Sequence, residues 1–452
     1  MSSLFHARSG ALSAARRHLR QLLLMIAGGL FAAPFTVFAA ESPLSLTETL
    51  NVAVLRSRQL MAADAALVAT EQMAIAAGQL PDPVLTLGLD SWPVDGRHQF
   101  SVGRDDFTMG RIAISQEVTR SDKRQLRAQH YTREGARAAA DKAVLTAVIE
   151  RNVALVWLER FFTEAMASLL ADQIDTATSE LTLADAAYRG GHGNLADVLT
   201  TRAVIAELQD RASEIDQRVV LAKTALTRWI GDAAARPLAT KPAFDLAGLD
   251  LDHLDTDLAH HPEITVLDRR EELAETDARL AEANRQADWS IALGYAQRGA
   301  GLSDFVSLSV SIPLQWDQAN RQDREVAAKH ALVEQIDAER EEALRREVGI
   351  VRARVLAWQR GRQRLERYDH ELIPLAQARV DATAAAYASG KGSATEVMRA
   401  RRDELDVRLR ALDLELKTAR SWAQLTFLLR ADDTPRYSHF GSSATAVEGV
   451  TP

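Results

Sequence analysis

A short glycine-rich phrase occurs twice in this chain, and each copy follows a long run of helix-forming residues. The first copy reads AYRGGHGN from Ala187 to Asn194, and the second reads AYASGKGS from Ala386 to Ser393. Because alanine, tyrosine and two glycines stand in register, the repetition predicts one structural unit that is built twice. The 452 residues are therefore expected to form one large repeated architecture rather than several unrelated domains.

The residues before and after the first phrase predict two long helices. Residues 119–189 contain no proline and a single glycine, Gly135, so they are expected to form one helix on the order of 100 Å long. Apolar residues recur there in steps of three, four or seven, which is the spacing of helices that pack as coiled coils. The same spacing continues through residues 194–230. Two long helices joined by a tight turn form an antiparallel hairpin.

The second half repeats this scheme. Residues 319–389 predict a long helix whose only expected irregularities are Gly349, Gly361 and Pro374, and residues 394–430 predict the returning helix. The glycines of both phrases are expected to end helices, because a helix C-cap commonly needs a residue in the left-handed conformation. The sequence thus predicts two helical hairpins in one chain.

Two pairs of shorter segments have the period of β-strands. In the second half, residues 289–313 alternate large apolar with small polar residues, as in WSIALGYA and VSLSVSI, and residues 83–115 hold a less regular pair. One apolar and one small polar face is typical of membrane barrels, although a soluble sheet with one buried face would show the same alternation. Four strands cannot close a barrel, so a membrane location would require several protomers that contribute four strands each.

The beginning of the chain has the layout of a secretory signal peptide. Within residues 1–39, arginines precede an apolar run, and VFA ending at Ala39 offers a cleavage site. An uncleaved membrane anchor is the alternative, since residues 21–40 are just long enough, but two glycines and Pro34 weaken it. No later stretch reaches eighteen consecutive apolar residues, so no spanning helix is expected in the mature chain.

The remaining segments complete the expected domain organisation. A first repeat at 44–230 is followed by a linker at 231–262 that would pack on the helices, a second repeat at 263–430 and a polar, disordered tail at 431–452. The fold class expected from these segments is mainly helical with a β-barrel portion.

Composition excludes several classes of function. The net charge is −8, and an exported form that lacks the N-terminal arginines is more acidic still, which argues against a nucleic-acid ligand. The chain contains no cysteine, so disulfides, thiolate metal sites and cysteine nucleophiles are excluded. The glycine phrases contain no GKS or GKT and are flanked by predicted helices on both sides, so a phosphate loop is not expected, and HEL at His370 lacks the second histidine of a zinc protease helix. Neither an enzyme nor a cofactor or metal site is expected.

Taken together, these features resemble the TolC family of outer-membrane efflux ducts. The most specific marks are AYRGGHGNLADVL and AYASGKGSATEVM, which look like the family's Tyr-x-x-Gly...(Asp/Glu)-Val-Leu turns, with Asp197 and Glu396 in the acidic place. The segments SQEVTRSDKR and SIPLQWDQANRQ are further matches. The resemblance implies a homotrimer in which three protomers form one twelve-stranded barrel that continues as a helical tunnel through the periplasm.

A narrower resemblance concerns the exported substrate. LPDPVLTLGLDSWPVDG followed by MGRIAISQEVTRSDKR looks most like members that accompany heavy-metal pumps of the resistance-nodulation-division type. This implies export of heavy-metal cations with a periplasmic adaptor and an inner-membrane pump as partners. Two alternatives stay open: a duct for drugs or other small organic molecules, and a trimeric coiled-coil adhesin or periplasmic scaffold without a pore. Many relatives carry an N-terminal cysteine as lipid anchor, and because this chain lacks one, anchoring would rest on the barrel.

The resemblance also assigns candidate docking residues. It places the glycine turns at the periplasmic tip of the tunnel, where close backbone approach by an adaptor's helical hairpins would be allowed. Simple hairpin closure is the alternative role of these turns. The candidate docking residues are Tyr188, Gly190, Gly191, Gly193, Tyr387, Gly390 and Gly392.

A gate is expected near the same tip. RVDATAAAY, which begins at Arg379, resembles the family segment whose acidic residue faces the pore, and this would place Asp381 at the constriction. Three copies would form a ring of like charges that attracts cations. Arg379 and Asp185, the latter four residues from Arg189, are candidates for closing ion pairs, with ordinary surface pairs as the alternative.

Overall fold

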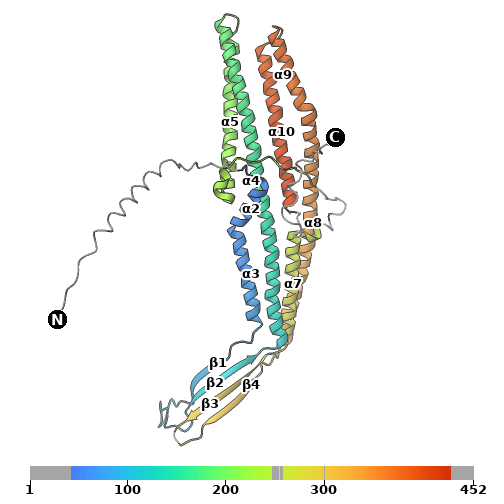
Figure 1. Ribbon diagram of the computed structural model, residues 1–452. Helices are drawn as coiled ribbons and strands as arrows, with labels where there is room; N and C mark the ends of the chain where they lie inside the picture. The colour runs from blue at the N-terminus through green and yellow to red at the C-terminus, as the bar shows by residue number, and fades with distance from the viewer. Residues whose placement is uncertain (1–41, 247–253, 255–257, 300, 429–452) are drawn as a thin grey trace, which may run out of the picture. The chain divides into compact units, whose positions relative to one another are not determined.

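The computed structural model describes residues 42–246, 254, 258–299 and 301–428 (Figure 1). The expected signal peptide and polar tail lie outside these residues, as does part of the linker. Residues from Leu44 onward form one compact unit. The expectation of a mainly helical chain with a small antiparallel sheet is confirmed.

The helices and strands follow in the same order in the two halves. The first half contains α2 (Leu46–Arg56), α3 (Arg58–Ala77), β1 (Val84–Asp90), β2 (Met109–Val118), α4 (Ser121–Arg189) and α5 (Leu195–Ile230). The second half contains α7 (Pro262–Ala283), β3 (Trp289–Arg298), β4 (Phe305–Ser311), α8 (Gln322–Arg367), the π-helical turn η4 (Tyr368–Leu372), α9 (Ile373–Ala388) and α10 (Ala394–Leu428).

The longest element, α4, extends without interruption for 69 residues. Figure 1 shows it running from the sheet alongside α3 and α7 and then alongside α5, and it also contacts α10. Its length follows from the absence of proline, because each residue can donate its backbone N–H to the preceding turn. The helix therefore connects the sheet to the first hairpin turn.

The corresponding helix of the second half is interrupted near Pro374. The backbone forms the π-helical turn Tyr368–Leu372 and continues as α9, in which the proline occupies the first turn. Proline has no N–H for the turn before it, and its ring crowds the carbonyl four residues earlier, so a local change of helical pitch relieves the conflict. The sequence predicted an irregularity at this residue.

Irregularities were also expected at Gly349 and Gly361, but α8 is a continuous helix through both. Gly361 is instead a point of close packing between α8 and α10. A Cβ atom built at Gly361 would meet the hydroxyl of Thr418 and lie 3.2 Å from its Cγ2 atom. That hydroxyl donates a hydrogen bond of 2.8 Å to the carbonyl of Leu414, and both Gly361 and Thr418 are buried. Glycine is thus required at 361 by packing rather than by backbone conformation.

The two glycines of α8 should respond oppositely to alanine. We expect Gly361→Ala to destabilise the protein by about 1–3 kcal/mol, because the new methyl group forces Thr418 aside. Gly349 is exposed with no atom within 4 Å of its Cβ position, so Gly349→Ala should stabilise the helix by about 0.5–1 kcal/mol. Denaturant midpoints of the purified variants measure both effects, and a loss of stability in both would contradict the packing argument.

The largest core lies where α2, α4, α5 and α10 meet. The segment that leads into α2 is held there by backbone bonds: the Leu44 N–H donates to the Pro237 carbonyl at 2.8 Å, and Leu44 pairs with Leu238 in a parallel bridge. Trp157 Nε1 donates to the Leu44 carbonyl and Trp422 Nε1 to the Asp245 carbonyl, at 3.3 and 3.1 Å. The described part of the linker is therefore held by the bridge to Leu44 and by the buried indole of Trp422.

One helix of the described chain, α3, is long and apolar enough on average to cross a membrane. It contains Arg58, Asp64 and Glu71, however, and Asp64 forms an ion pair with Lys142 of α4. A Cβ atom at Gly135 of α4 would lie 2.9 Å from the Thr70 hydroxyl, so the two helices are closely packed. We therefore assign α3 to the helical bundle.

Candidate functional site

The four strands form one antiparallel sheet with the order β1-β2-β3-β4 and a regular register. Leu87 lies opposite Ile112, Ile112 opposite Tyr295, and Leu293 opposite Leu308, so large apolar residues share one face. All of them are exposed to solvent in the described chain. The members of this apolar face are Leu85, Leu87, Leu89, Ile112, Ile114, Ile291, Leu293, Tyr295, Val306, Leu308 and Val310.

The opposite face of the sheet is mostly small and polar, although Val84 and Phe305 stand on it at the ends of the edge strands. It carries Thr86, Gly88, Ala113, Ser115, Ala292, Gly294, Ala296, Ser307 and Ser309 in register. Arg111 stands among these small residues and forms an ion pair of 3.5 Å with Asp90. A Cβ atom at Gly294 would lie 3.5 Å from Arg111 Nε and 2.7 Å from Ser307 Oγ, so glycine leaves room for the guanidinium side chain.

Both edges of this sheet are open in the described chain. β1 pairs only with β2, and β4 pairs only with β3. A strand edge presents backbone N–H and C=O groups without partners, which in hydrocarbon would each cost several kilocalories per mole. An apolar face combined with two open edges is stable in lipid only if other strands complete the sheet.

The two predicted tips are tight turns that connect α4 to α5 and α9 to α10. Gly191 and Gly390 have φ values of 76° and 72°, in the left-handed region that side chains other than glycine rarely adopt. A Cβ atom at Gly193 would lie 2.7 Å from the Tyr188 backbone nitrogen, and one at Gly392 would lie 3.2 Å from Ala386 Cβ. These glycines are thus required by the turn itself, and Tyr188 and Tyr387 are exposed beside them.

The turns differ in how the returning helix is capped. In the second turn, Ser393 Oγ accepts from the Glu396 N–H and the Glu396 carboxylate accepts from the Ser393 N–H, which is a capping box. The hydrogen bond from the Ser393 N–H to the carboxylate is the main cause that lowers the pKa of Glu396. In the first turn, the Asn194 side chain caps the Ala196 N–H.

In the first turn, the backbone conformation requires glycine at Gly191 but not at Gly190. We expect Gly191→Ala to cost about 1–2 kcal/mol, because alanine is disfavoured at positive φ. Gly190 has a φ of −78°, and a Cβ atom there would make an ordinary contact of 3.4 Å with the Ala186 carbonyl oxygen, so Gly190→Ala should change stability little. Hydrogen exchange of the amides in residues 187–194 measures both, and equal loss of protection in the two variants would contradict this assignment.

The candidate gate residues lie on the helices near the tips, where Arg379 and Asp381 are exposed and Asp185 is half-buried. Asp185 pairs with Arg189 within α4, as expected from their spacing. Arg379 pairs with Asp403 of α10 at 2.9 Å, whereas Asp381 accepts a hydrogen bond of 3.3 Å from Gln377. Each ion pair is internal to its own hairpin, the first within α4 and the second between α9 and α10. The assignment of Asp381 to a gate stays a prediction.

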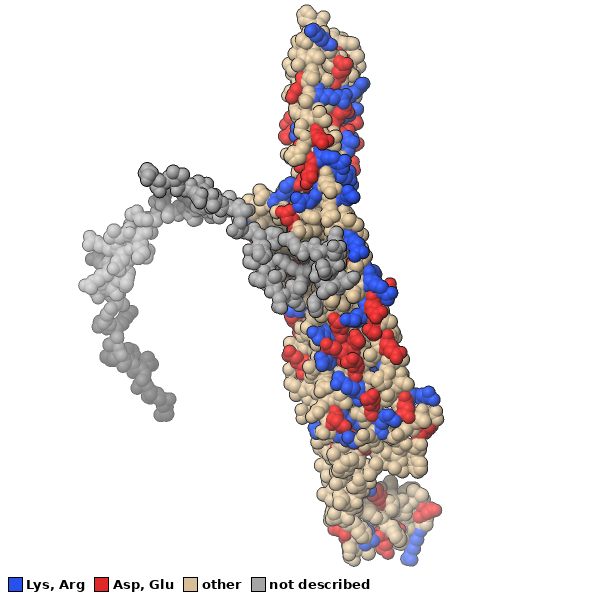
Figure 2. All heavy atoms as spheres, turned by 90° about the vertical axis from the view of Figure 1, so that its right-hand side faces the viewer, with Lys and Arg blue, Asp and Glu red and all other residues tan. Residues whose placement is uncertain are grey.

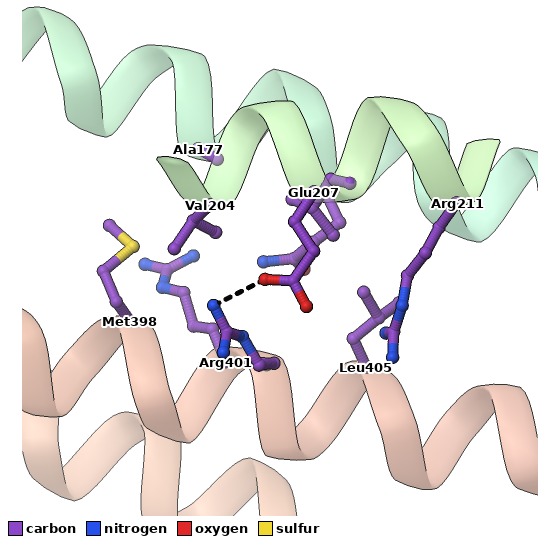
Figure 3. A pocket seen from close by; sticks show the side chains of 10 residues that line it. Ala177, Val204, Glu207, Arg211, Met398, Arg401 and Leu405 are labelled. Atoms are coloured by element: carbon purple, nitrogen blue, oxygen red, sulfur yellow. Dashed lines mark ion pairs between the residues drawn. The ribbon is translucent and has the colours of Figure 1, made fainter. Parts of the chain in front are cut away.

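A seam of charged residues joins the two hairpins, and the sequence did not indicate it. Arg401 and Arg402 of α10 pair with Glu180 of α4 and Glu207 of α5, each at 2.8 Å. Figure 3 shows Glu207 and Arg211 facing α10 across a crevice of about 10 Å³, into which Val204, Met398 and Leu405 also project. The crevice is about the size of one water molecule.

The rest of the helical surface has no patch of a single charge on the face shown. In Figure 2 acidic and basic side chains are interspersed along the helices. Among the described residues, no group of three or more histidine, aspartate or glutamate side chains is placed to hold a metal ion.

No protein-family model and no curated protein matches this chain. Its fold, however, is that of solved outer-membrane channels. VceC from Vibrio cholerae matches with a TM-score of 0.69 at 20% identity, over 85% of this chain and 95% of that one. CusC matches with a TM-score of 0.71 at 15% identity over 85% and 91%, and MtrE from Neisseria gonorrhoeae with 0.66 at 14% over 85% and 88%. Identities this low show similarity of fold only.

Proposed function

We propose that this chain is one protomer of a trimeric outer-membrane channel that serves as the exit duct of a tripartite efflux pump. The observation that carries the proposal is the four-stranded sheet with an exposed apolar face, a small polar face and two open edges. Three such sheets joined edge to edge give twelve strands, which exceeds the eight of the smallest closed single-chain barrels. The apolar face would then contact lipid and the polar face would line the lumen.

The helical hairpins support the same assignment. The long helices α4 and α8 lead from the sheet toward the two hairpins, and the fold matches that of solved outer-membrane channels. In this proposal the helices of three protomers form a tunnel in the periplasm. Residues 1–39 are the export signal that is cleaved off, and the mature chain is a passive duct without enzymatic activity. Channel formation by the purified protein, described at the end of the Discussion, tests this function.

A periplasmic adaptor and an inner-membrane pump of the resistance-nodulation-division type are the proposed partners. The tips expose Tyr188 and Tyr387 beside turns that present backbone to a partner. Because Gly190 tolerates a side chain within the turn, Gly190→Trp tests docking more cleanly than substitutions at Gly191. If an adaptor docks there, this variant should lose efflux while the assembled channel stays in the membrane. Full efflux by Gly190→Trp would assign the first turn to hairpin closure alone.

We propose heavy-metal cations as the exported substrate, on the sequence resemblance described above. The similarity to CusC is of the same degree as that to VceC, so the comparisons favour no substrate. Drugs or other small organic molecules are the second candidate. A deletion strain tested with copper, silver, zinc, cobalt and cadmium beside a panel of dyes distinguishes them, because sensitivity to dyes alone would contradict the metal assignment.

A coiled-coil adhesin or periplasmic scaffold is the alternative of another class. Such a protein would have no use for an exposed apolar sheet face. Solubility of the mature protein in water without detergent, together with the absence of conductance in a lipid bilayer, would favour this alternative over a duct.

A further inference from the structure

The seam between the two hairpins contains one ion pair that is much less exposed than its neighbour. The side chains of Glu180 and Arg401 retain exposed fractions of 18% and 28%, whereas those of Glu207 and Arg402 retain 49% and 43%. Both pairs connect α10 to the first hairpin at the same distance of 2.8 Å. The two pairs therefore differ mainly in the hydration that their charges have lost.

The Glu180–Arg401 pair is also incompletely hydrogen-bonded. Within the described residues, Glu180 Oε2 and Arg401 Nε are both buried and have no hydrogen-bond partner. A buried ion pair recovers the cost of dehydration only when its remaining donors and acceptors are satisfied. One 2.8 Å contact between two charges, with a buried polar atom left over on each side, falls short of this condition.

We propose that the ionised carboxylate of Glu180 opposes the packing of the two hairpins, so that neutralising this group stabilises the packed arrangement. While Glu180 carries its charge, the cost of burying that charge favours separation of the two hairpins. The hairpins are held together against it by the apolar contacts of Leu208 and Leu405 and by the more exposed pairs. The inference concerns contacts within one protomer and does not depend on the proposed function.

The titration of Glu180 agrees with this geometry. Burial raises the pKa of Glu180, and the opposing attraction of Arg401 is the smaller effect. A carboxyl group with a higher pKa in the packed than in the separated arrangement binds its proton more tightly when packed. Protonation therefore stabilises the packed arrangement fully at pH values below the pKa that Glu180 has when the hairpins are separated. This stabilisation is lost as the pH rises through the higher pKa that Glu180 has when the hairpins are packed.

Other charged groups near Glu180 have to be separated from it. Arg401 faces it from α10, and Glu207, Arg211 and Arg402 line the adjoining crevice. A pH dependence that survives in Glu180→Gln would belong to these groups.

The absence of cysteine in the chain makes a distance measurement direct. We would introduce cysteines at the exposed residues Ala206 of α5 and Arg399 of α10 and attach spin labels to the full-length protein, diluted with unlabelled protomers. Electron–electron double resonance then reports the fraction of protomers with separated hairpins. Replacement of the whole pair in Glu180→Leu/Arg401→Met should lower this fraction at least about fivefold at about pH 8, the low end for exchange of a poorly compensated buried pair. Glu180→Gln, whose amide oxygen can still accept from Arg401, should change the fraction in the same direction. Wild-type protein should show a fall in the same direction when acidified to about pH 4, below the pKa of an exposed glutamate.

One further variant serves as a control. Glu207→Gln removes a carboxylate from the exposed neighbouring pair and should change the separated fraction by less than about twofold. A larger separated fraction in Glu180→Gln or in Glu180→Leu/Arg401→Met, or a wild-type fraction that does not fall on acidification, would overturn the proposal.

Discussion

Arginine in place of Leu308 should prevent stable insertion of the protein into the outer membrane, whereas arginine in place of the adjacent Ser309 should be tolerated. Leu308 lies on the apolar face of the sheet with 69% of its surface exposed, and Ser309 lies on the small polar face. In a water-soluble protein both substitutions would introduce a hydrated surface charge at little cost. In lipid, arginine near the bilayer midplane costs about 2–4 kcal/mol, and a trimer would bear this cost three times.

The measurement is the amount of folded, membrane-inserted protein after fractionation of cells that express each variant. Ser309→Arg is a matched control, because it has the same new side chain one residue away on the same strand. Equal recovery of both variants from the membrane would show that the apolar face does not contact lipid. Loss of both would indicate that strand β4 tolerates no large residue, and would remove the distinction between the faces.

The second large effect is expected at Arg160, which is buried in the core between α4 and the linker. Only 2% of this residue is exposed, and its Nη1 and Nη2 atoms donate to the carbonyls of Ala234 and Arg236, each at 2.8 Å. Its Nε atom donates to Glu164 at 2.9 Å. We expect Arg160→Met to destabilise the protein by about 3–5 kcal/mol, because two buried carbonyls and a carboxylate lose their donor.

Arg218→Met is the comparison for this prediction. Arg218 also pairs with a glutamate of α4, Glu159, at 3.0 Å, but 35% of its side chain is exposed. Its loss should cost less than about 1 kcal/mol. Chemical denaturation of both variants gives the free energies of unfolding, and a cost at Arg160 as small as that at Arg218 would contradict the structural role assigned to the buried guanidinium.

The helices could be predicted from the sequence because their signals are local. The first long helix was predicted for residues 119–189 and forms from Ser121 to Arg189, since no proline interrupts it. The glycine turns were predictable for the same reason, as Gly191 and Gly390 adopt the left-handed conformation that a C-cap requires. Local signals of this kind depend on residues within one turn of helix.

The second strand was less predictable because its alternation is broken. Residues as far as Ser115 were assigned to it, but β2 continues to Val118. Gln116 stands on the apolar face, opposite Ile291, and uses its side-chain amide to donate to the Pro81 carbonyl at 2.7 Å. A polar residue that is satisfied by a loop carbonyl has no signature in the local sequence.

The seam could not be predicted because its partners are far apart in the chain. Glu180 and Arg401 each look like ordinary charged residues of a solvated helix, and only the packing of the two hairpins brings them together. Arg379 illustrates the same limit, since its partner proved to be Asp403 on the returning helix. The pairing of charges along long helices depends on their relative rotation, which spacing alone does not determine.

The closure of a barrel by strands from different protomers is the central claim, and disulfide trapping between the two sheet edges tests it. The chain contains no cysteine, so pairs can be introduced with one residue in β1, Val84–Asp90, and one in β4, Phe305–Ser311. Within one protomer these strands are separated by β2 and β3 and lie roughly 14 Å apart at ordinary strand spacing. A disulfide requires Cα atoms within about 7 Å, so a bond between the edges must join two protomers.

Among the cysteine pairs tested, those in one register of β1 against β4 should give covalent dimers and trimers, and no larger species, when the membrane-inserted protein is oxidised. The purified cross-linked trimers should produce discrete conductance steps in a lipid bilayer. Monomers at every register, or an open-ended ladder of oligomers, would contradict a closed barrel of three protomers.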